Sequence, residues 1–124
     1  MSPNSQRWSD MCGTISRIEV TPDGDLVVET NLAAWTWSPV GDCCANAYIE
    51  AKECAEELPA MIGQEIVLAT VAAGDSLDGE GDTCHDITFY KILGRSSDLT
   101  ITLHVEHNGY YGGELDCSSY VEAV

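Results

Sequence analysis

Short runs of alternating apolar and polar residues are the feature that most restricts how this chain can fold. The clearest run covers residues 99–106 and is followed by Asn108-Gly109, a pair that tolerates the positive φ angles of a tight turn. Pro22-Asp23-Gly24 is a second turn signal, and it separates two further runs. Since a period of two places alternate side chains on the same face, these runs predict antiparallel strands with one buried face.

The pattern predicts six strands, over residues 13–20, 26–30, 34–38, 64–72, 85–93 and 99–106. Ile15 falls on the polar side of the first strand and interrupts its alternation. The run at 64–72 is apolar on both faces, which is typical of a fully buried strand. A short edge strand is expected at Tyr120-Val121. Trp35 and Trp37 share one face of the third strand, where they either form a core layer or present a platform for a ligand.

One helix is predicted, over residues 42–58, with Asp42, or Asn46 if the helix starts late, as its cap and with Pro59 and Gly63 closing it. Small apolar residues recur in it at three-to-four spacing, namely Ala47, Ala51, Cys54, Ala55 and Leu58. The order of elements predicts an α+β fold in which an antiparallel sheet of about six strands carries one main helix on one face. We expect a single domain over residues 1–124, with a polar leader at 1–12 and the folded part at 13–124.

The charge of the chain is strongly one-sided. It carries 21 acidic against 5 basic residues, a formal net charge of −16, while 44% hydrophobic residues indicate a globular protein. Such a charge repels nucleic acid and anionic membranes, and it suits a basic protein partner. The polar first ten residues contain no signal peptide, and no apolar run is long enough to span a bilayer. We therefore expect a cytoplasmic protein without direct binding to nucleic acid or membrane.

The cysteines and histidines do not form a recognised metal motif. The six cysteines include no Cys-x-x-Cys pair, so most are expected to be small buried residues, with three disulfides as the alternative for a secreted protein. His104 and His107 are expected on opposite faces of a strand, which does not suit joint ligation. A site involving Cys84 and His85 would require further ligands nearby, so no metal and no cofactor are expected. The acidic loop 73–82 either binds Ca²⁺ or is solvated, and it lacks the spacing of an EF-hand.

The stretch 107–113 carries the most unusual chemistry. Two tyrosines follow the Asn-Gly turn and precede Gly112-Gly113, where the backbone can approach another group closely. The stretch is either a hairpin turn whose tyrosines pack on the sheet or a binding loop with two rings and free amides. No Gly-x-Ser-x-Gly motif and no phosphate-binding loop is present, so we expect no catalytic residues and no enzyme.

Three segments have distinctive sequences: Gly41-Asp42-Cys43-Cys44-Ala45-Asn46-Ala47-Tyr48-Ile49, Thr88-Phe89-Tyr90-Lys91 and Asn108-Gly109-Tyr110-Tyr111-Gly112-Gly113. These segments resemble a family of small phage and prophage proteins in which an Asp-Cys-Cys motif opens a helix and an Asn-Gly-Tyr-Tyr loop follows a late strand. The resemblance extends over residues 13–113. The family is similar to the Thoeris anti-defence sponges, which bind cyclic ADP-ribose-type signals, and sometimes cyclic oligonucleotides, between subunits without cleaving them.

The resemblance implies a non-catalytic phage counter-defence protein that sequesters a cyclic nucleotide or cyclic ADP-ribose-type signal in the infected host cell. Its ligand-binding residues would be Asn108, Tyr110, Tyr111, Gly112, Gly113, Arg95, Trp35 and Trp37. A tyrosine of the loop and one of the two tryptophans would stack a base, while Arg95 would meet a phosphate.

The charge supports an alternative function, that of an acidic nucleic-acid mimic of the anti-CRISPR or anti-restriction type, which binds a basic host protein. In either case we expect a homodimer or higher homo-oligomer with the loop 108–113 near the subunit boundary. Exposed aromatic surface of this kind is usually covered by association, and two-fold pairing is its commonest form.

Overall fold

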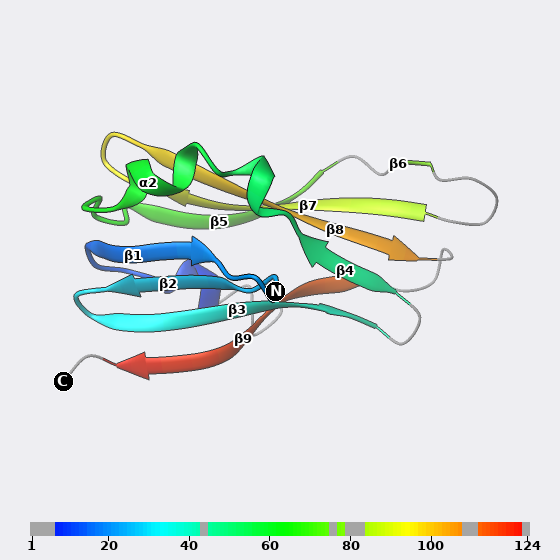
Figure 1. The fold of residues 1–124 in the computed structure, drawn as a ribbon, viewed down its shortest axis with the longest axis horizontal. Helices are drawn as coiled ribbons and strands as arrows, with labels where there is room; N and C mark the ends of the chain where they lie inside the picture. Colours follow the sequence, from blue (N-terminus) through cyan, green and yellow to red (C-terminus); the bar gives the residue numbers. More distant parts are fainter. Residues whose placement is uncertain (1–6, 43–44, 75–76, 79–83, 108–111, 123–124) are drawn as a thin grey trace.

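Two antiparallel sheets lie face to face in the computed structural model, which describes residues 7–42, 45–74, 77–78, 84–107 and 112–122 (Figure 1). The first sheet has the order β1 (Ile15–Val20), β2 (Leu26–Thr30), β3 (Ala33–Gly41), β9 (Gly113–Glu122). The second has the order β4 (Asn46–Ile49), β8 (Asp98–His107), β7 (Cys84–Leu93), β5 (Leu68–Ala73), with β6 (Leu77–Asp78) paired to β7. The fold is therefore mostly antiparallel β, as expected, but it has two sheets.

Alternation positions the core as the sequence predicts. In β8, Leu99, Ile101, Leu103 and Val105 are all buried, and the residues between them face outward. The irregular start of β1 is explained by a register shift between Ile15 and Arg17. An extra residue at such a β-bulge brings Ile15 to the same buried face as Ile18.

The predicted helix over 42–58 is wrong. Residues 46–49 form β4, which pairs with β8, and only a 3-10 turn (Ala51–Glu53) and the five-residue helix α2 (Glu57–Met61) follow. Over so short a distance the small apolar residues fit the period of a strand as well as that of a helix. Pairing with β8 then satisfies the backbone hydrogen bonds of Tyr48 and Ile49 in extended form. Several glutamates at the end of a longer helix would also have opposed its dipole.

The short helix α2 closes one side of the sandwich. It contacts both β8 of the second sheet and β1 of the first. Met61 at its end is fully buried, and Cys54 just before it is buried as well. β4 pairs only with residues 103–106 of β8, and α2 makes further contacts with the same strand.

Residues 1–12 were expected to be a polar leader outside the folded part, but Trp8 and Met11 are buried in the core. The Trp8 ring packs edge-on against Trp37, with centroids 5.1 Å apart, and against Tyr90, at 5.2 Å. Its Nε1–H donates to the carbonyls of Thr70 and Lys91, at 3.1 and 3.3 Å. A single tryptophan in a polar stretch gives no periodic signal, so sequence patterning could not place it.

Two strands differ in extent and burial from the prediction. The strand predicted at 64–72 is β5, an edge strand with Leu68 about half exposed, so it is not buried on both faces. The short strand predicted at Tyr120-Val121 is the end of β9, a ten-residue strand that pairs with the whole of β3. No helix in the described part of the chain is long and apolar enough to span a bilayer.

Replacing Trp8 and Trp37 by phenylalanine should separate the contributions of their indole groups. Trp8→Phe leaves the carbonyls of Thr70 and Lys91 without their donor, whereas Trp37 Nε1 has no hydrogen-bond partner among the described residues. We therefore expect Trp8→Phe to lower the free energy of unfolding by about 1–2 kcal/mol more than Trp37→Phe does. Urea unfolding measures the difference, and equal losses would contradict a stabilising role of the two hydrogen bonds.

Candidate functional site

Both connections that cross between the sheets lie at the same end of the molecule. At this end, β3 is followed by β4 of the other sheet, and β8 is followed by β9 (Figure 1). Gly41 and Gly113 are paired across β3 and β9. We call this region, formed by residues 40–42 and 112–114, the crossover end.

Two glycines permit the close approach of chain segments here. A Cβ atom on Gly113 would lie 2.9 Å from the Val40 carbonyl oxygen, 3.1 Å from Val105 and 3.2 Å from Ala47. Gly113 thus touches the first sheet through Val40 and the second through Val105 and Ala47. A Cβ atom on Gly41 would lie 2.5 Å from the Ala45 carbonyl oxygen. Neither position accommodates a side chain without displacement of backbone.

Two of the three segments that carry the family resemblance meet at the crossover end. The Asp42 N–H donates to the Gly112 carbonyl at 2.9 Å, and the Gly112 N–H donates to Asp42 Oδ2 at 3.3 Å. A turn closes behind Asp42, whose carbonyl accepts from the Ala45 N–H at 2.7 Å. Asp42 and Gly112, which are 70 positions apart in the sequence, are therefore joined by two hydrogen bonds, one between backbone groups and one to the carboxylate.

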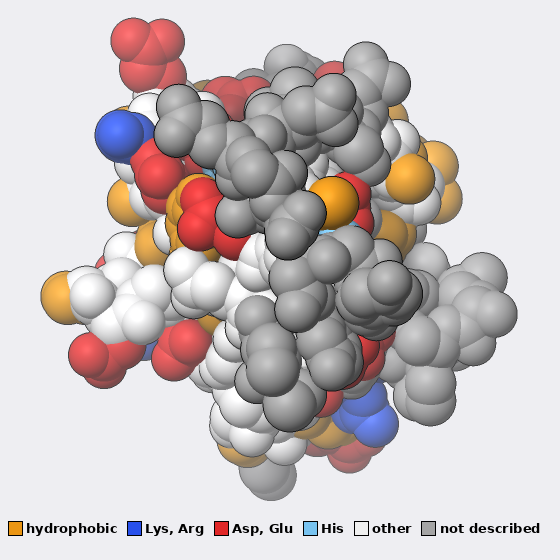
Figure 2. Space-filling model, turned by 90° about the vertical axis from the view of Figure 1, so that its right-hand side faces the viewer, with side chains coloured by type: hydrophobic (Ala, Val, Ile, Leu, Met, Phe, Trp, Pro, Cys, Tyr) orange, Lys and Arg blue, Asp and Glu red, His pale blue; other side chains and the backbone are white. Residues whose placement is uncertain are grey.

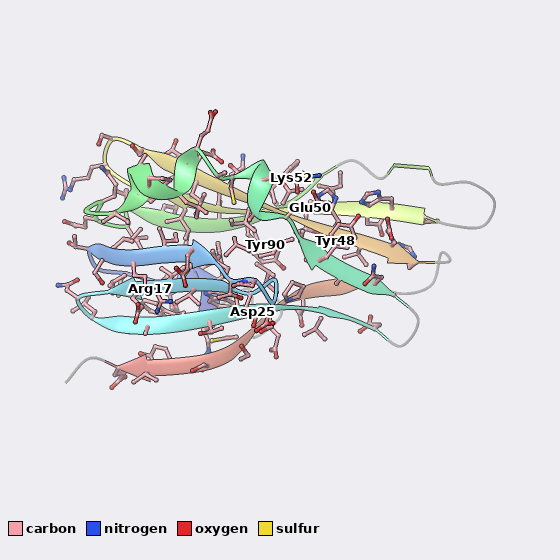
Figure 3. The ribbon with its side chains drawn as sticks, in the orientation of Figure 1. Arg17, Asp25, Tyr48, Glu50, Lys52 and Tyr90 are labelled. Carbon is pink, nitrogen blue, oxygen red and sulfur yellow. The ribbon has the colours of Figure 1, made fainter. Side chains whose placement is uncertain are left out.

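The third segment of the resemblance, residues 88–91, contacts β9 from the core through Tyr90. Tyr90 lies between the sheets (Figure 3), and its hydroxyl accepts a hydrogen bond from the Leu115 N–H at 3.1 Å. Burial raises the pKa of the Tyr90 hydroxyl, the Leu115 hydrogen bond lowers it and Glu114 raises it. Tyr90 therefore secures the start of β9, two residues beyond Gly113.

A hollow of about 260 Å³ lies at the crossover end, lined by Val40, Asp42, Gly113 and Glu114. Among the described residues that line it, Asp42 and Glu114 carry carboxylates, and none is a lysine or arginine. Figure 2 faces this end and shows red Asp and Glu side chains on it, while the visible Lys and Arg side chains lie at the periphery. The hollow suits a cationic group better than an anionic one.

The structure separates several residues of the predicted ligand site. Trp35 and Trp37 are buried in the core, so neither is available to stack a base. Arg95 lies in the turn before β8 and pairs with Glu65 at 3.5 Å, whereas Gly112 and Gly113 follow the far end of that strand. Ten residues of strand span about 30 Å, so Arg95 is not a neighbour of the two glycines. Asn108, Tyr110 and Tyr111 lie outside the described residues.

A second polar group lies on the outer face of the second sheet; we call it the histidine cluster, formed by Tyr48, Glu53, His85, His104 and Glu106. His85 Nε2 and His104 Nδ1 are 2.9 Å apart, and His104 Nε2 is 2.7 Å from Glu53 Oε1. The Tyr48 ring stacks on His104 with centroids 5.0 Å apart, and its hydroxyl donates to Glu106 Oε1 at 3.2 Å. Figure 3 places Tyr48 on β4, close to Glu50 and Lys52.

Strand register explains how the histidine cluster forms. His85 is directly opposite Glu106, and both Ile87 and Tyr48 are opposite His104. Leu103 and Val105 face the core, so His104 and Glu106 face outward. The meeting of His85 and His104 was not predicted from the sequence. Pairing the predicted fifth and sixth strands as a hairpin, in the register that the structure shows, makes these two residues diagonal neighbours.

The expectation that His104 and His107 point to opposite faces is confirmed. His107 lies on the inner side, where its Nε2 is 2.5 Å from Asp86 Oδ2, and it is opposite Cys84 on β7. As the side chains lie, no group of three His, Cys, Asp or Glu in the described ranges is placed to hold a metal ion.

The cysteines differ in how far they are buried. Of the four that are described, Cys54 is buried, Cys84 and Cys117 are partly exposed and Cys12 is exposed, and all four are free thiols. The expectation that most cysteines are buried is therefore not met among these four. Cys43 and Cys44 lie outside the described residues, as does most of the loop 73–82 for which Ca²⁺ was considered.

These features define a small two-sheet β protein with a carboxylate-lined crossover end and a separate histidine cluster. The chain belongs to the family described as a domain of unknown function, DUF7448, whose model matches residues 12–117. No curated protein matches the chain. No solved structure matches it either.

Alanine substitutions at the two adjacent glycines should have different effects. A Cβ at Gly113 meets backbone and two core side chains, while the nearest atom to one at Gly112 is Asp42 Oδ2 at 3.9 Å. We expect Gly113→Ala to destabilise the protein by about 1–3 kcal/mol through overpacking, and Gly112→Ala to change stability by less than about 0.5 kcal/mol. Thermal and urea unfolding of both variants test this. Similar losses at the two positions would argue against the close sheet contact at Gly113.

Proposed function

We propose that this protein is a non-catalytic binding protein whose crossover end receives a basic group of another protein. The observation that carries the proposal is the hollow in which Asp42 and Glu114 line the same space beside Gly113. The partner would present a lysine or arginine there, on a basic surface of the kind that otherwise binds nucleic acid. This is the alternative suggested by the charge of −16, and we propose it here for a particular surface.

The pairing of the few cations supports this location. Arg17 pairs with Glu19 and Glu29, Lys52 with Glu50, and Arg95 with Glu65. The remaining two, Arg7 and Lys91, lie over the rings of Tyr120 and Phe89. None of the five lines the hollow. A cationic group from a partner would therefore meet no competing lysine or arginine of this chain among the lining residues.

The geometry of Asp42 suits recognition of a guanidinium or ammonium group. A carboxylate accepts about four hydrogen bonds, and the Gly112 N–H, which binds Asp42 Oδ2, also holds this side chain in place. Charge-assisted hydrogen bonds to arginine are roughly twice as strong as neutral ones. The overall negative field would accelerate the approach of a basic partner, and salt would weaken that acceleration.

Calorimetry with an oligoarginine peptide tests the proposal. The double variant Asp42→Asn/Glu114→Gln removes both charges of the hollow, and the amide introduced at position 42 keeps an oxygen for the Gly112 N–H. We expect binding to weaken about tenfold relative to the wild type, a change of about 1.4 kcal/mol. Binding by the wild type should also fall at about 1 M salt, where the Debye length is only about 3 Å.

The matched control is Asp23→Asn/Asp98→Asn, which removes the same charge from two exposed positions outside the hollow. If the control weakens binding as much as the double variant does, the attraction is that of the net charge and the crossover end is not the site. If the wild type does not bind at low salt, the proposal of a basic partner fails.

A second candidate, the sequestration of a cyclic nucleotide signal, is favoured by one observation. Asp42 and Gly112, from two separate segments of the family resemblance, are in direct contact. In this case the backbone amides near Gly112 and the adjoining loop 108–111 would bind the ligand, without Trp35, Trp37 or Arg95. Two copies would share the ligand across the crossover end.

Calorimetry against cyclic ADP-ribose isomers and cyclic di- and trinucleotides tests the second candidate. The expected result is one ligand per two chains, with light scattering that reports a dimer when ligand is present. Asp42→Asn should strengthen binding of these anions, because it removes a repelling charge while leaving an acceptor for Gly112. A dissociation constant in the high micromolar range corresponds to a binding free energy of about 4–6 kcal/mol. If no ligand binds even at such concentrations, this function is excluded.

A further inference from the structure

Strand β9 forms one edge of the first sheet. The strand order of that sheet ends with β9, which pairs with β3 on one side and lies at the border of the molecule on the other (Figure 1). Near the end of this strand, Tyr120 and Val121 are 41% and 61% exposed. An edge strand presents backbone donors and acceptors with which another strand can pair.

The hydrogen bonds of β3 show which backbone groups of β9 point outward. In an antiparallel pair, opposite residues alternate between exchanging two hydrogen bonds and exchanging none. The Ala33 N–H donates to Thr30 Oγ1 at 3.3 Å, so it does not bind Glu122, which lies opposite Ala33. Two residues further along β3, Trp35 has the same phase and lies opposite Tyr120. The N–H and C=O groups of Tyr120 and Glu122 are therefore directed away from β3.

The other end of β9 gives the same phase. Pro39 has no N–H and lies opposite Leu115, whose N–H is directed away from β3 and donates to the Tyr90 hydroxyl at 3.1 Å. Tyr90 thus satisfies the outward donor at Leu115. No hydrogen bond among the described residues uses the outward backbone groups at positions 120 and 122. The part of the edge that can accept another strand is therefore the end of β9.

The composition of β9 determines which strand can pair with it. Edge strands are commonly protected by lysine or proline, and β9 contains no lysine, arginine or proline. Its charged side chains are Glu114, Asp116 and Glu122. A second copy of β9 would place like charges side by side, which destabilises strand pairs. A basic segment would meet opposite charges, so the charge of the strand favours a basic segment as the occupant.

The two faces of β9 favour different side chains in an added strand. On the inner face, Arg7 lies 5.1 Å from the centre of the Tyr120 ring, and the Tyr120 hydroxyl donates to Glu122 at 3.2 Å. Because a cation of this chain already lies there, a lysine or arginine of a partner is favoured on the outer face. That face carries the Asp116 carboxylate and the apolar surface of Val121, which suits the stem of a lysine.

We propose that an extended segment of a basic partner protein pairs with residues 120–122 of β9 and becomes the fifth strand of the first sheet. Lysine or arginine at every second position lies on the outer face, and the apolar residues between them pack beside Tyr120. This inference rests on the proposed function, because a segment that continues along β9 brings its next basic group to the hollow that Glu114 lines.

A peptide of about ten residues, with alternating lysine and valine, tests the inference on the full chain, since β9 itself has ten residues. The peptide should shift the amide NMR signals of Tyr120 and Glu122. By calorimetry it should bind Tyr120→Pro about tenfold more weakly than Tyr120→Val, which corresponds to the loss of one hydrogen bond. Both variants lose the tyrosine ring, but only proline removes the outward N–H.

The Tyr120 N–H takes no part in the ladder with β3, and proline is tolerated on an edge strand at such a position. The fold of Tyr120→Pro should therefore be retained, and circular dichroism checks this.

Modified peptides measure the same contact without changing the protein. Methylation of the backbone nitrogens, either at all valines or at all lysines, keeps the charge of the peptide. One of the two patterns removes the donors that face β9 and should weaken binding to the wild type about tenfold. If the peptide does not bind, or if both methylated peptides bind as tightly as the unmodified one, the inference is overturned.

Equal affinity of folded Tyr120→Pro and Tyr120→Val for the peptide would also overturn the inference. In that case, weaker binding by Asp42→Asn/Glu114→Gln would still support the proposed function, so the two failures are distinguishable. A wild-type dimer that Tyr120→Pro dissociates, measured by light scattering, would contradict the inference as well, because a second copy would then occupy the edge.

Discussion

The close backbone contact at Gly41 and Gly113 is the constraint on which the rest of this structure depends. Both sheet crossings occur there, and a Cβ atom on either glycine would collide with a neighbouring backbone carbonyl oxygen. Because β3 and β9 pair along their whole length from this point, the contact aligns the first sheet. Because Gly113 also touches Val105 and Ala47, it sets the separation of the two sheets. Trp8 and Tyr90 fill the space that this separation leaves.

A chain with a net charge of −16 folds here because strand alternation keeps carboxylates out of the core. Thr30 is the one buried polar residue among those described, and its hydroxyl donates to the Cys12 carbonyl and accepts from the Leu32 N–H in the turn that joins β2 and β3. The ion pairs of Arg17, Lys52 and Arg95 are all exposed, and such pairs contribute only about 0–1 kcal/mol each. Stability therefore comes from the apolar interior, and the acidic surface remains available for function.

Strand β8 serves two different environments through its two faces. Its inward side chains form the core, and His107 at its end meets Asp86 on that side. Its outward side chains include His104 and Glu106, which contact residues of β4, β7 and the 3-10 turn. The histidine cluster and the crossover end thus depend on the same strand, although they face different sides of the sheet.

Local patterning by itself determined most strands, the shared face of Trp35 and Trp37 and the opposite faces of His104 and His107, because each of these follows from a period of two. Patterning gave the wrong structure for the segment 42–58, because a few small apolar residues fit a helix as well as a strand. Only pairing with β8 decided between the two. Trp8, the approach of Asp42 to Gly112 and the meeting of His85 with His104 join parts of the chain that are far apart in the sequence. Such contacts depend on how the two sheets pack and which strands are neighbours, so only the tertiary structure decided them.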